Sequence, residues 1–102
     1  MQPVKMILTY DIRRDVSDSY YQFVLGEMVP TLQSLGLMMG GAWHTAYGDY
    51  PMRLVEFIAE DLHVLDGVLT SPTWEQLENT LQHYVQNYSR KVVPLREGQF
   101  QF

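Results

Sequence analysis

The residues from Gly41 to Leu62 constrain the fold more than any other part of this sequence. Apolar and polar residues alternate on both sides of the turn-forming segment Gly48 to Pro51, a pattern typical of two antiparallel strands joined by a hairpin. Asp61 follows the second strand and can cap a helix by accepting a hydrogen bond from a free backbone amide. The middle of the chain is therefore predicted to form strand, turn, strand and helix.

The N-terminal part predicts a strand followed by a long helix. Apolar residues alternate from Val4 to Ile12, as in a half-buried strand. Ser17 or Asp18 can cap the helix, and Gly36 can end it. Inside the helix, Pro30 lacks the amide that would bond to Gly26, so we expect a bend there. The predicted buried stripe consists of Tyr21, Val24, Leu25, Met28, Leu32 and Leu35.

The hairpin and the C-terminal part complete the predicted order of elements. The hairpin strands are expected over Leu37 to Tyr47, with a bulge or close backbone approach at Gly40-Gly41, and over Met52 to Ala59. Ser71 and Pro72 predict the start of a second long helix. Its expected stripe is Trp74, Leu77, Leu81, Tyr84, Val85 and Tyr88, and a last strand, at an edge or bulge because of Pro94, is expected over Lys91 to Arg96.

This order predicts one α+β domain over residues 1–102, a ferredoxin-like βαββαβ protomer. Two helices on one face of a four-stranded antiparallel sheet would leave the other face uncovered and apolar. A second copy is the natural cover, and two such sheets packed face to face form a dimeric α+β barrel. Whether the barrel interior is a pocket or solid core depends on side-chain volume.

The composition excludes several classes of function. The net charge of -5, with only 7 Lys and Arg residues and no basic cluster, argues against nucleic acid as a partner. The absence of cysteine excludes disulfides and thiolate chemistry. No apolar stretch is long enough to cross a membrane, and no targeting segment is evident, so a soluble cytoplasmic protein is expected.

Several of these segments resemble one known family. These segments are Trp43-His-Thr, the stretch from Arg53 to Leu62, and Ser71-Pro-Thr-Trp74, with Gly48 between the first two. In these three segments the sequence resembles the NIPSNAP-like branch of the dimeric alpha+beta barrels. This superfamily also includes the antibiotic-biosynthesis monooxygenases. The resemblance covers nearly the whole chain, and it implies a ferredoxin-like protomer and a homodimer more strongly than any activity.

One face of the predicted hairpin mixes aromatic rings with polar groups, as ligand pockets do. If Tyr47 pairs with Met52, the opposite face carries small residues suited to helix packing, and His44 lies there. Thr9 and Asp11 would join the first face if their strand turns its polar side the same way. The predicted ligand-binding residues are Trp43, Thr45, Tyr47, Thr9, Asp11, Leu54 and Ile58.

Glu56 and His44 are the candidate catalytic residues. A carboxylate held among apolar neighbours can act as a general base, but Glu56 could instead form a salt bridge with Arg53, Arg13 or Arg96. His44 could transfer protons or simply be a packed or surface residue. The three histidines have no metal-ligand spacing, so neither a metal nor a cofactor is expected, and haem has only His44 in its favour.

The sequence thus leaves three functions open. The first choice is a homodimeric barrel that binds a small apolar or aromatic molecule between the sheets. The alternative is a cofactor-independent monooxygenase or isomerase that uses Glu56 or His44 as general base. The third is a structural dimer whose lumen is filled by side chains.

Overall fold

A computed structural model of the chain describes residues 2–45 and 52–95. All strand pairs are antiparallel, and the strand order is β2-β3-β1-β4. This order and the alternation of strands with helices define the ferredoxin-like α+β fold, as predicted. The strands are β1 (Val4–Ile12), β2 (Met38–Thr45), β3 (Met52–Ala59) and β4 (Val85–Pro94), and the helices are α1 (Ser17–Phe23), α2 (Val29–Ser34), α3 (Leu62–Leu69) and α4 (Pro72–Tyr84).

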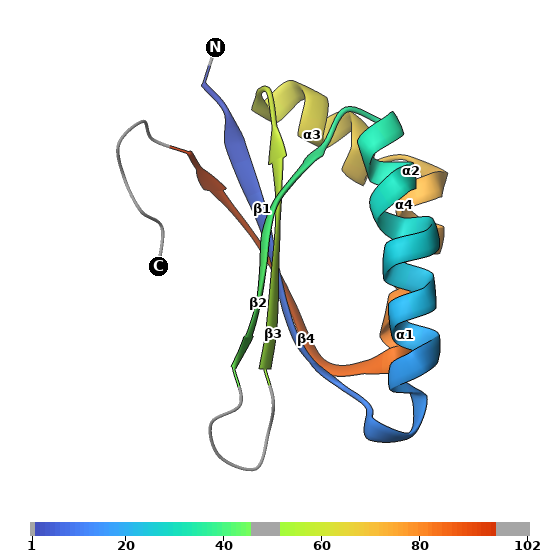
Figure 1. Cartoon of the computed structure of the whole chain (residues 1–102). Helices are drawn as coiled ribbons and strands as arrows, with labels where there is room; N and C mark the ends of the chain where they lie inside the picture. Colours follow the sequence, from blue (N-terminus) through green and yellow to red (C-terminus); the bar gives the residue numbers. More distant parts are fainter. Residues whose placement is uncertain (1, 46–51, 96–102) are drawn as a thin grey trace.

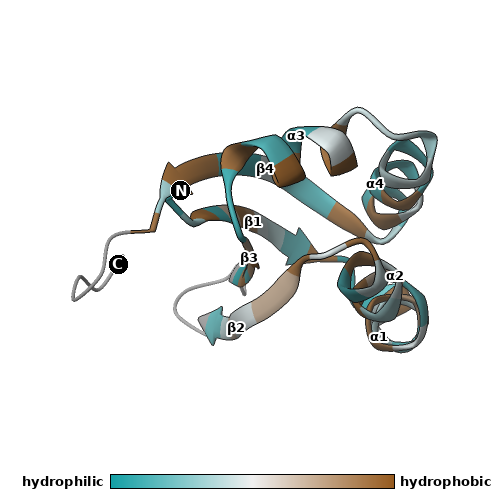
Figure 2. Cartoon of the chain, turned by 90° about the horizontal axis from the view of Figure 1, so that it is seen from above, coloured by the Kyte–Doolittle hydropathy of each residue, from teal (hydrophilic) through white to brown (hydrophobic). Residues whose placement is uncertain are grey.

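Helices α1, α2 and α4 lie on the same side of the sheet in both views (Figures 1 and 2). The core fills the space between these two layers, because the inward residues of β1 and β3 meet the apolar stripes of the helices. Among the described residues, no helix or strand covers the opposite side. We call that side the open face. The fully buried large side chains include Trp74, Tyr10, Tyr20, Phe57, Met6, Leu8 and Leu81.

A π-helical turn, Val24–Met28, joins α1 to α2 near the position where the sequence predicted a bend. Pro30 cannot donate to Gly26, and the amide of Val29 donates instead to the carbonyl of Val24, five residues back. The wider turn shifts the buried stripe, so Leu25 is 62% exposed although the sequence predicted it to be buried. The predicted cap was also wrong, since Val16 occupies that position without a side-chain bond.

The other helix caps follow the prediction. The amide of Val64 donates to Asp61 Oδ1 over 2.9 Å, and the amide of Trp74 donates to Ser71 Oγ over 3.2 Å. Gly36 ends the first helical region with φ at 102°, a conformation that glycine adopts without strain.

The boundary between α4 and β4 differs from the prediction. The helix ends at Tyr84, and the strand begins at Val85, six residues before the expected start at Lys91. The register shifts where Asn87 adopts a φ of 57°, so this strand contains a bulge. The bulge places Val85 and Tyr88, three residues apart, on the helix side. Their spacing imitates a helical stripe, which explains the error.

Candidate functional site

The structure gathers much of the predicted ligand set on the open face. Thr9 pairs with Leu54, and Leu54 pairs in turn with Trp43, so the three residues form one row across β1, β3 and β2. Ile58 lies further along β3 on the same side, where it pairs with Met38. Trp43 is 42% exposed and Met38 is 70% exposed. This face therefore presents apolar surface, as expected for a sheet without a helix layer.

The hairpin register differs from the prediction by two residues. Thr45, rather than Tyr47, pairs with Met52. Because side chains alternate with a period of two, a shift of two residues leaves the face assignments of Trp43 and Leu54 unchanged. Tyr47 and the turn from Gly48 to Pro51 lie outside the described residues.

Glu56 forms an ion pair that the sequence analysis did not anticipate. Its Oε1 lies 3.1 Å from Nζ of Lys5, and the two side chains are 9% and 4% exposed. The predicted alternatives were Arg53, Arg13 and Arg96, of which Arg96 is outside the described residues. The signal was present, because Lys5 alternates with the core residues of β1 and therefore shares a face with Thr9 and Glu56.

Gly41 in β2 leaves room for an aromatic ring beside Glu56. Gly41 pairs with Glu56, and a Cβ atom placed on Gly41 would lie 2.6 Å from Cη2 of Trp43. The indole therefore lies over Gly41, in space that any other side chain would fill. The preceding residue, Gly40, is at the predicted bulge and lies close to the side chain of Ile58. The two glycines let an aromatic ring lie flat along the strand.

Asp11 and His44 are separated from this centre. Asp11 lies near the end of β1, where its Oδ2 accepts a hydrogen bond of 2.8 Å from Asn87 Nδ2. His44 is exposed and pairs with Arg53, so it lies on the helix side of the sheet. Glu56 and His44 therefore lie on opposite faces of the protomer's sheet.

A second polar cluster lies on the helix side, and the sequence analysis did not find it. The hydroxyl oxygens of Tyr10 and Tyr20 share a hydrogen bond of 2.5 Å inside the core. Burial raises the pKa of Tyr10 far above its usual value of 10.0, and the neighbouring Tyr20 raises it further. Burial likewise raises the pKa of Tyr20, while the hydrogen bond shared with Tyr10, the charge of Arg53 and a side-chain hydrogen bond with Arg53 act in the opposite direction.

The cluster continues into β4. Tyr88 stacks on Tyr10 with ring centroids 6.4 Å apart, and its hydroxyl donates to Glu78 over 2.7 Å. Burial and this contact with Glu78 raise the pKa of Tyr88. Glu78 also binds Arg90, whose guanidinium carbon lies 5.7 Å from the centroid of the Trp74 ring. The raised pKa values keep buried Tyr10 and Tyr20 and half-buried Tyr88 neutral at pH values where a free tyrosine would ionise.

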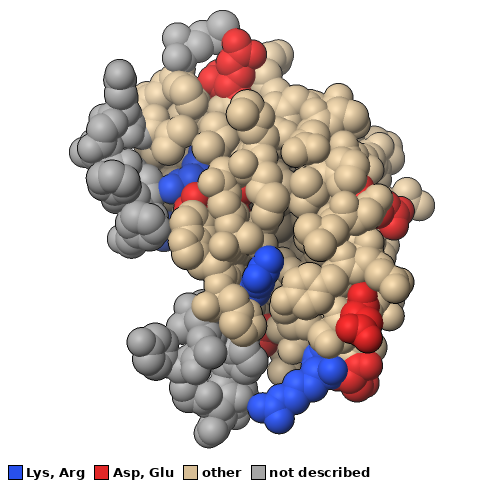
Figure 3. Space-filling view, viewed as in Figure 1, with Lys and Arg blue, Asp and Glu red and all other residues tan. Residues whose placement is uncertain are grey.

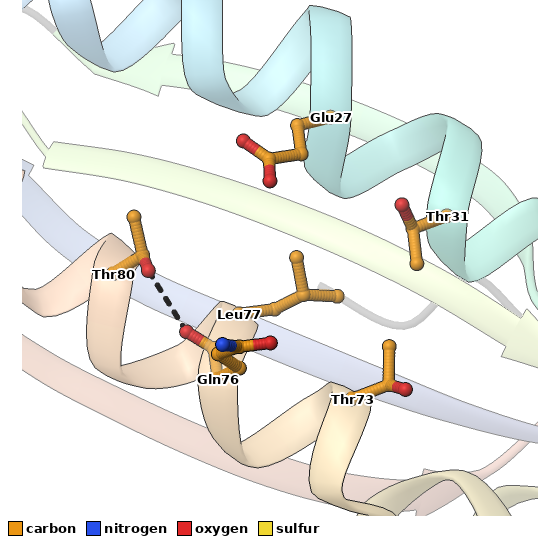
Figure 4. Close-up of a pocket in the computed structure, with 6 residues that line it drawn as sticks. All are labelled: Glu27, Thr31, Thr73, Gln76, Leu77 and Thr80. Atoms are coloured by element: carbon orange, nitrogen blue, oxygen red, sulfur yellow. Dashed lines mark hydrogen bonds between the residues drawn. The ribbon is translucent and has the colours of Figure 1, made fainter.

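A groove of about 250 Å³ lies between the helical segment that carries Glu27 and Thr31 and helix α4 (Figure 4). The hydrogen bond drawn between two of its lining residues runs from Thr80 Oγ1 to the carbonyl of Gln76, within α4. Within the described residues, no group of three or more His, Asp or Glu side chains could hold a metal ion. The groove is lined by Glu27, Thr31, Thr73, Gln76, Leu77 and Thr80.

Charge and hydropathy add two observations about the described part of the chain. Basic side chains stand apart from one another on the face shown in Figure 3. None of the helices there is long and apolar enough to cross a membrane.

The architecture defines a ferredoxin-like α+β protein with one helix-covered sheet face and one open face. No family model matches the sequence, and the search of curated proteins finds no match. Solved structures with the same fold are found, and several are NIPSNAP family proteins.

Three of these structures illustrate the similarity. A NIPSNAP family protein from Agrobacterium tumefaciens is 12% identical with a TM-score of 0.67, over 96% of this chain and 90% of that one. An uncharacterized NIPSNAP-like domain protein from Burkholderia xenovorans is 17% identical with a TM-score of 0.68, over 98% and 90%. A Bacteroides thetaiotaomicron protein of unknown function, described as a possible oxidoreductase, is 6% identical with a TM-score of 0.71, over 92% and 98%.

These identities are low, so the similarities establish the fold alone. The structures agree with the NIPSNAP-like, ferredoxin-like fold that the sequence indicated.

Proposed function

We propose that this chain forms a homodimer through its open face and that the enclosed lumen binds a small apolar or aromatic molecule. The observation that carries the proposal is the exposed Trp43 indole, which lies over Gly41 next to the buried pair of Lys5 and Glu56. A lone protomer would leave this ring and its apolar neighbours in water. A two-fold related copy offers the same apolar surface and can cover it.

The side chains of the open face also indicate the chemistry of the ligand. Ile7, Leu54 and Ile58 are half-buried and supply apolar contacts, while Trp43 supplies a ring for stacking. Lys5 and Glu56 neutralise each other, so this part of the wall carries no net charge. A neutral, flat molecule matches such a surface better than a highly charged one.

The dimer is tested by sedimentation velocity at micromolar concentration. The wild-type chain is expected to sediment as a dimer, and Ile58→Glu is expected to produce folded monomers, because it places a charge on the apolar open face that the partner would have to bury. Leu25→Glu is the matched control, since Leu25 is exposed on the π-helical turn on the other side of the protomer. A folded wild-type monomer would refute the dimer.

Ligand binding is tested with Nile red, a neutral aromatic dye. Its emission should rise on binding the wild-type dimer, and Trp43→Ala should weaken binding about ten-fold because a stacking surface is removed. If the wild-type dimer leaves the emission unchanged, the lumen is filled by side chains and the protein is a structural dimer.

Catalysis is the second candidate function, favoured by the position of Glu56 opposite Gly41 and the Trp43 indole. A cofactor-independent monooxygenase or isomerase would use Glu56 to remove a proton from an activated carbon. Exchange of such protons for deuterium can be followed by NMR with a set of aromatic ketones. Glu56→Gln should abolish exchange and His44→Ala should not, whereas exchange that survives Glu56→Gln excludes this base.

A further inference from the structure

The helix side of the sheet carries one continuous row of polar and aromatic residues. His44 pairs with Arg53 across β2 and β3, and Arg53 pairs with Tyr10 across β3 and β1. Tyr20 and Tyr21, both from α1, lie against this row, and their rings form an edge-to-face pair with centroids 4.9 Å apart. The row is on the opposite side of the sheet from Glu56 and Trp43.

Arg53 is a cation without an acid partner in the part of the chain that the structure describes. The two ion pairs there join Lys5 to Glu56 and Arg90 to Glu78. The guanidinium carbon of Arg53 lies 5.7 Å from the centroid of the Tyr21 ring, and its Nε is buried without a hydrogen-bond acceptor. A buried donor that lacks an acceptor is unfavourable, because it has lost its hydrogen bonds to water without replacement.

One end of the row is accessible from solvent and the other is sealed. Tyr10 and Tyr20 are 2% and 0% exposed, so this end of the row is closed to solvent. Tyr21 is 38% exposed, Arg53 is half-buried and His44 is exposed. Arg53 therefore lies between the buried tyrosines and the exposed His44 end of the row.

We propose that Arg53 binds the carboxylate of a small planar molecule at this end of the row. The planar guanidinium offers donors in a geometry that matches a carboxylate. The exposed ring of Tyr21 provides a surface for the flat part of the molecule, and His44 can supply a further donor. This site is separate from the proposed lumen and does not depend on dimerisation.

The test follows the arginine Nε–Hε signals of the full chain by ¹H–¹⁵N NMR during titration with benzoate. The signal of Arg53 should shift progressively with benzoate and should stay in place with benzyl alcohol, which has the same ring but no charge. If the two compounds act alike, or if neither moves the signal at millimolar concentration, the proposal is refuted without any variant.

Variants then locate the site. Arg53→Met should weaken benzoate binding about ten-fold or more, because a charge-assisted hydrogen bond is lost. Arg14→Met is the matched control at an exposed position and should bind as the wild type does. Trp43→Ala should leave the Arg53 shift intact, since it changes the other face. Unchanged binding by a folded Arg53→Met variant, or loss of the shift in Trp43→Ala, would overturn the assignment.

Discussion

Removing Lys5 should destabilise the protein far more than removing another lysine from the same sheet face. Nζ of Lys5 lies 3.1 Å from Glu56 Oε1, and the two side chains are only 4% and 9% exposed. At an effective dielectric constant of about 20, this separation corresponds to an attraction of about 5 kcal/mol. Lys5→Met would cancel the attraction and leave the Glu56 carboxylate buried without a counter-charge, which typically costs about 3–5 kcal/mol.

The double variant separates this charge effect from packing. Lys5→Met combined with Glu56→Leu replaces the pair with apolar side chains, a change that is often neutral or stabilising for buried ion pairs. We therefore expect the free energy of unfolding to fall by about 3 kcal/mol or more in Lys5→Met and to return to within about 1 kcal/mol of wild type in the double variant.

Urea unfolding followed by circular dichroism measures these free energies. The protein concentration must be the same for all variants, because association would make stability depend on it. Lys91→Met is the control, since Lys91 is exposed and pairs with Ile7 on the same face. It should change stability by less than about 0.5 kcal/mol. If Lys5→Met changes stability no more than this control does, the ion pair is not buried as described.

Three further predictions concern other parts of the fold. Tyr10, Tyr20 and Tyr88 have a raised pKa in the folded state, so stability should be complete below pH 10.0, the ordinary tyrosine value, and should fall above it; spectrophotometric titration should show them ionising only as the chain unfolds. Gly41→Ala should displace the Trp43 indole, and the Trp43 emission, obtained by subtracting the spectrum of Trp43→Phe, should shift to longer wavelength; an unshifted emission would contradict the close contact. Asn87→Ala should be less stable than Asn87→Gly by about 1 kcal/mol in urea unfolding, because only glycine adopts a φ of 57° without strain; equal stabilities would argue against the bulge geometry.

Much of the fold could be predicted because its strands and caps depend on local pattern. The bounds of β1 and β3 agree with the period-two alternation, and Asp61 and Ser71 cap their helices as expected. The faces of the hairpin were also correct although the register was not. The predicted strand register was wrong by two residues, and only a shift by an odd number of residues exchanges the two faces of a strand.

Two errors, the start of β4 and the burial of Leu25, arise where an extra residue interrupts a regular spacing. The bulge at Asn87 makes the inward residues of β4 three apart, so Val85 and Tyr88 imitate a helix. The π-helical turn widens the first helical region and turns Leu25 outward. A prediction from hydrophobic periodicity assumes that buried residues recur at a constant spacing. An inserted residue changes that spacing while leaving the composition of the segment the same.

The partners of the candidate site residues could not be predicted, because they depend on how distant segments meet. The alternation in β1 places Lys5 on the face of Glu56, but only the register of β1 with β3 brings the two charges into contact. The contact between Tyr10 and Tyr20 requires the packing of α1 on the sheet. Neither contact has a sequence motif.

The third strand, β3, positions both candidate sites back to back. Successive residues of a strand point to opposite faces, so Glu56 contributes to the open face while Arg53 contributes to the helix side. The charge of Glu56 is neutralised within the protomer by Lys5, and the surface around it is therefore suited to a second protomer and a neutral ligand. The charge on the helix side has no such partner among the described residues, and that surface is suited to an anion.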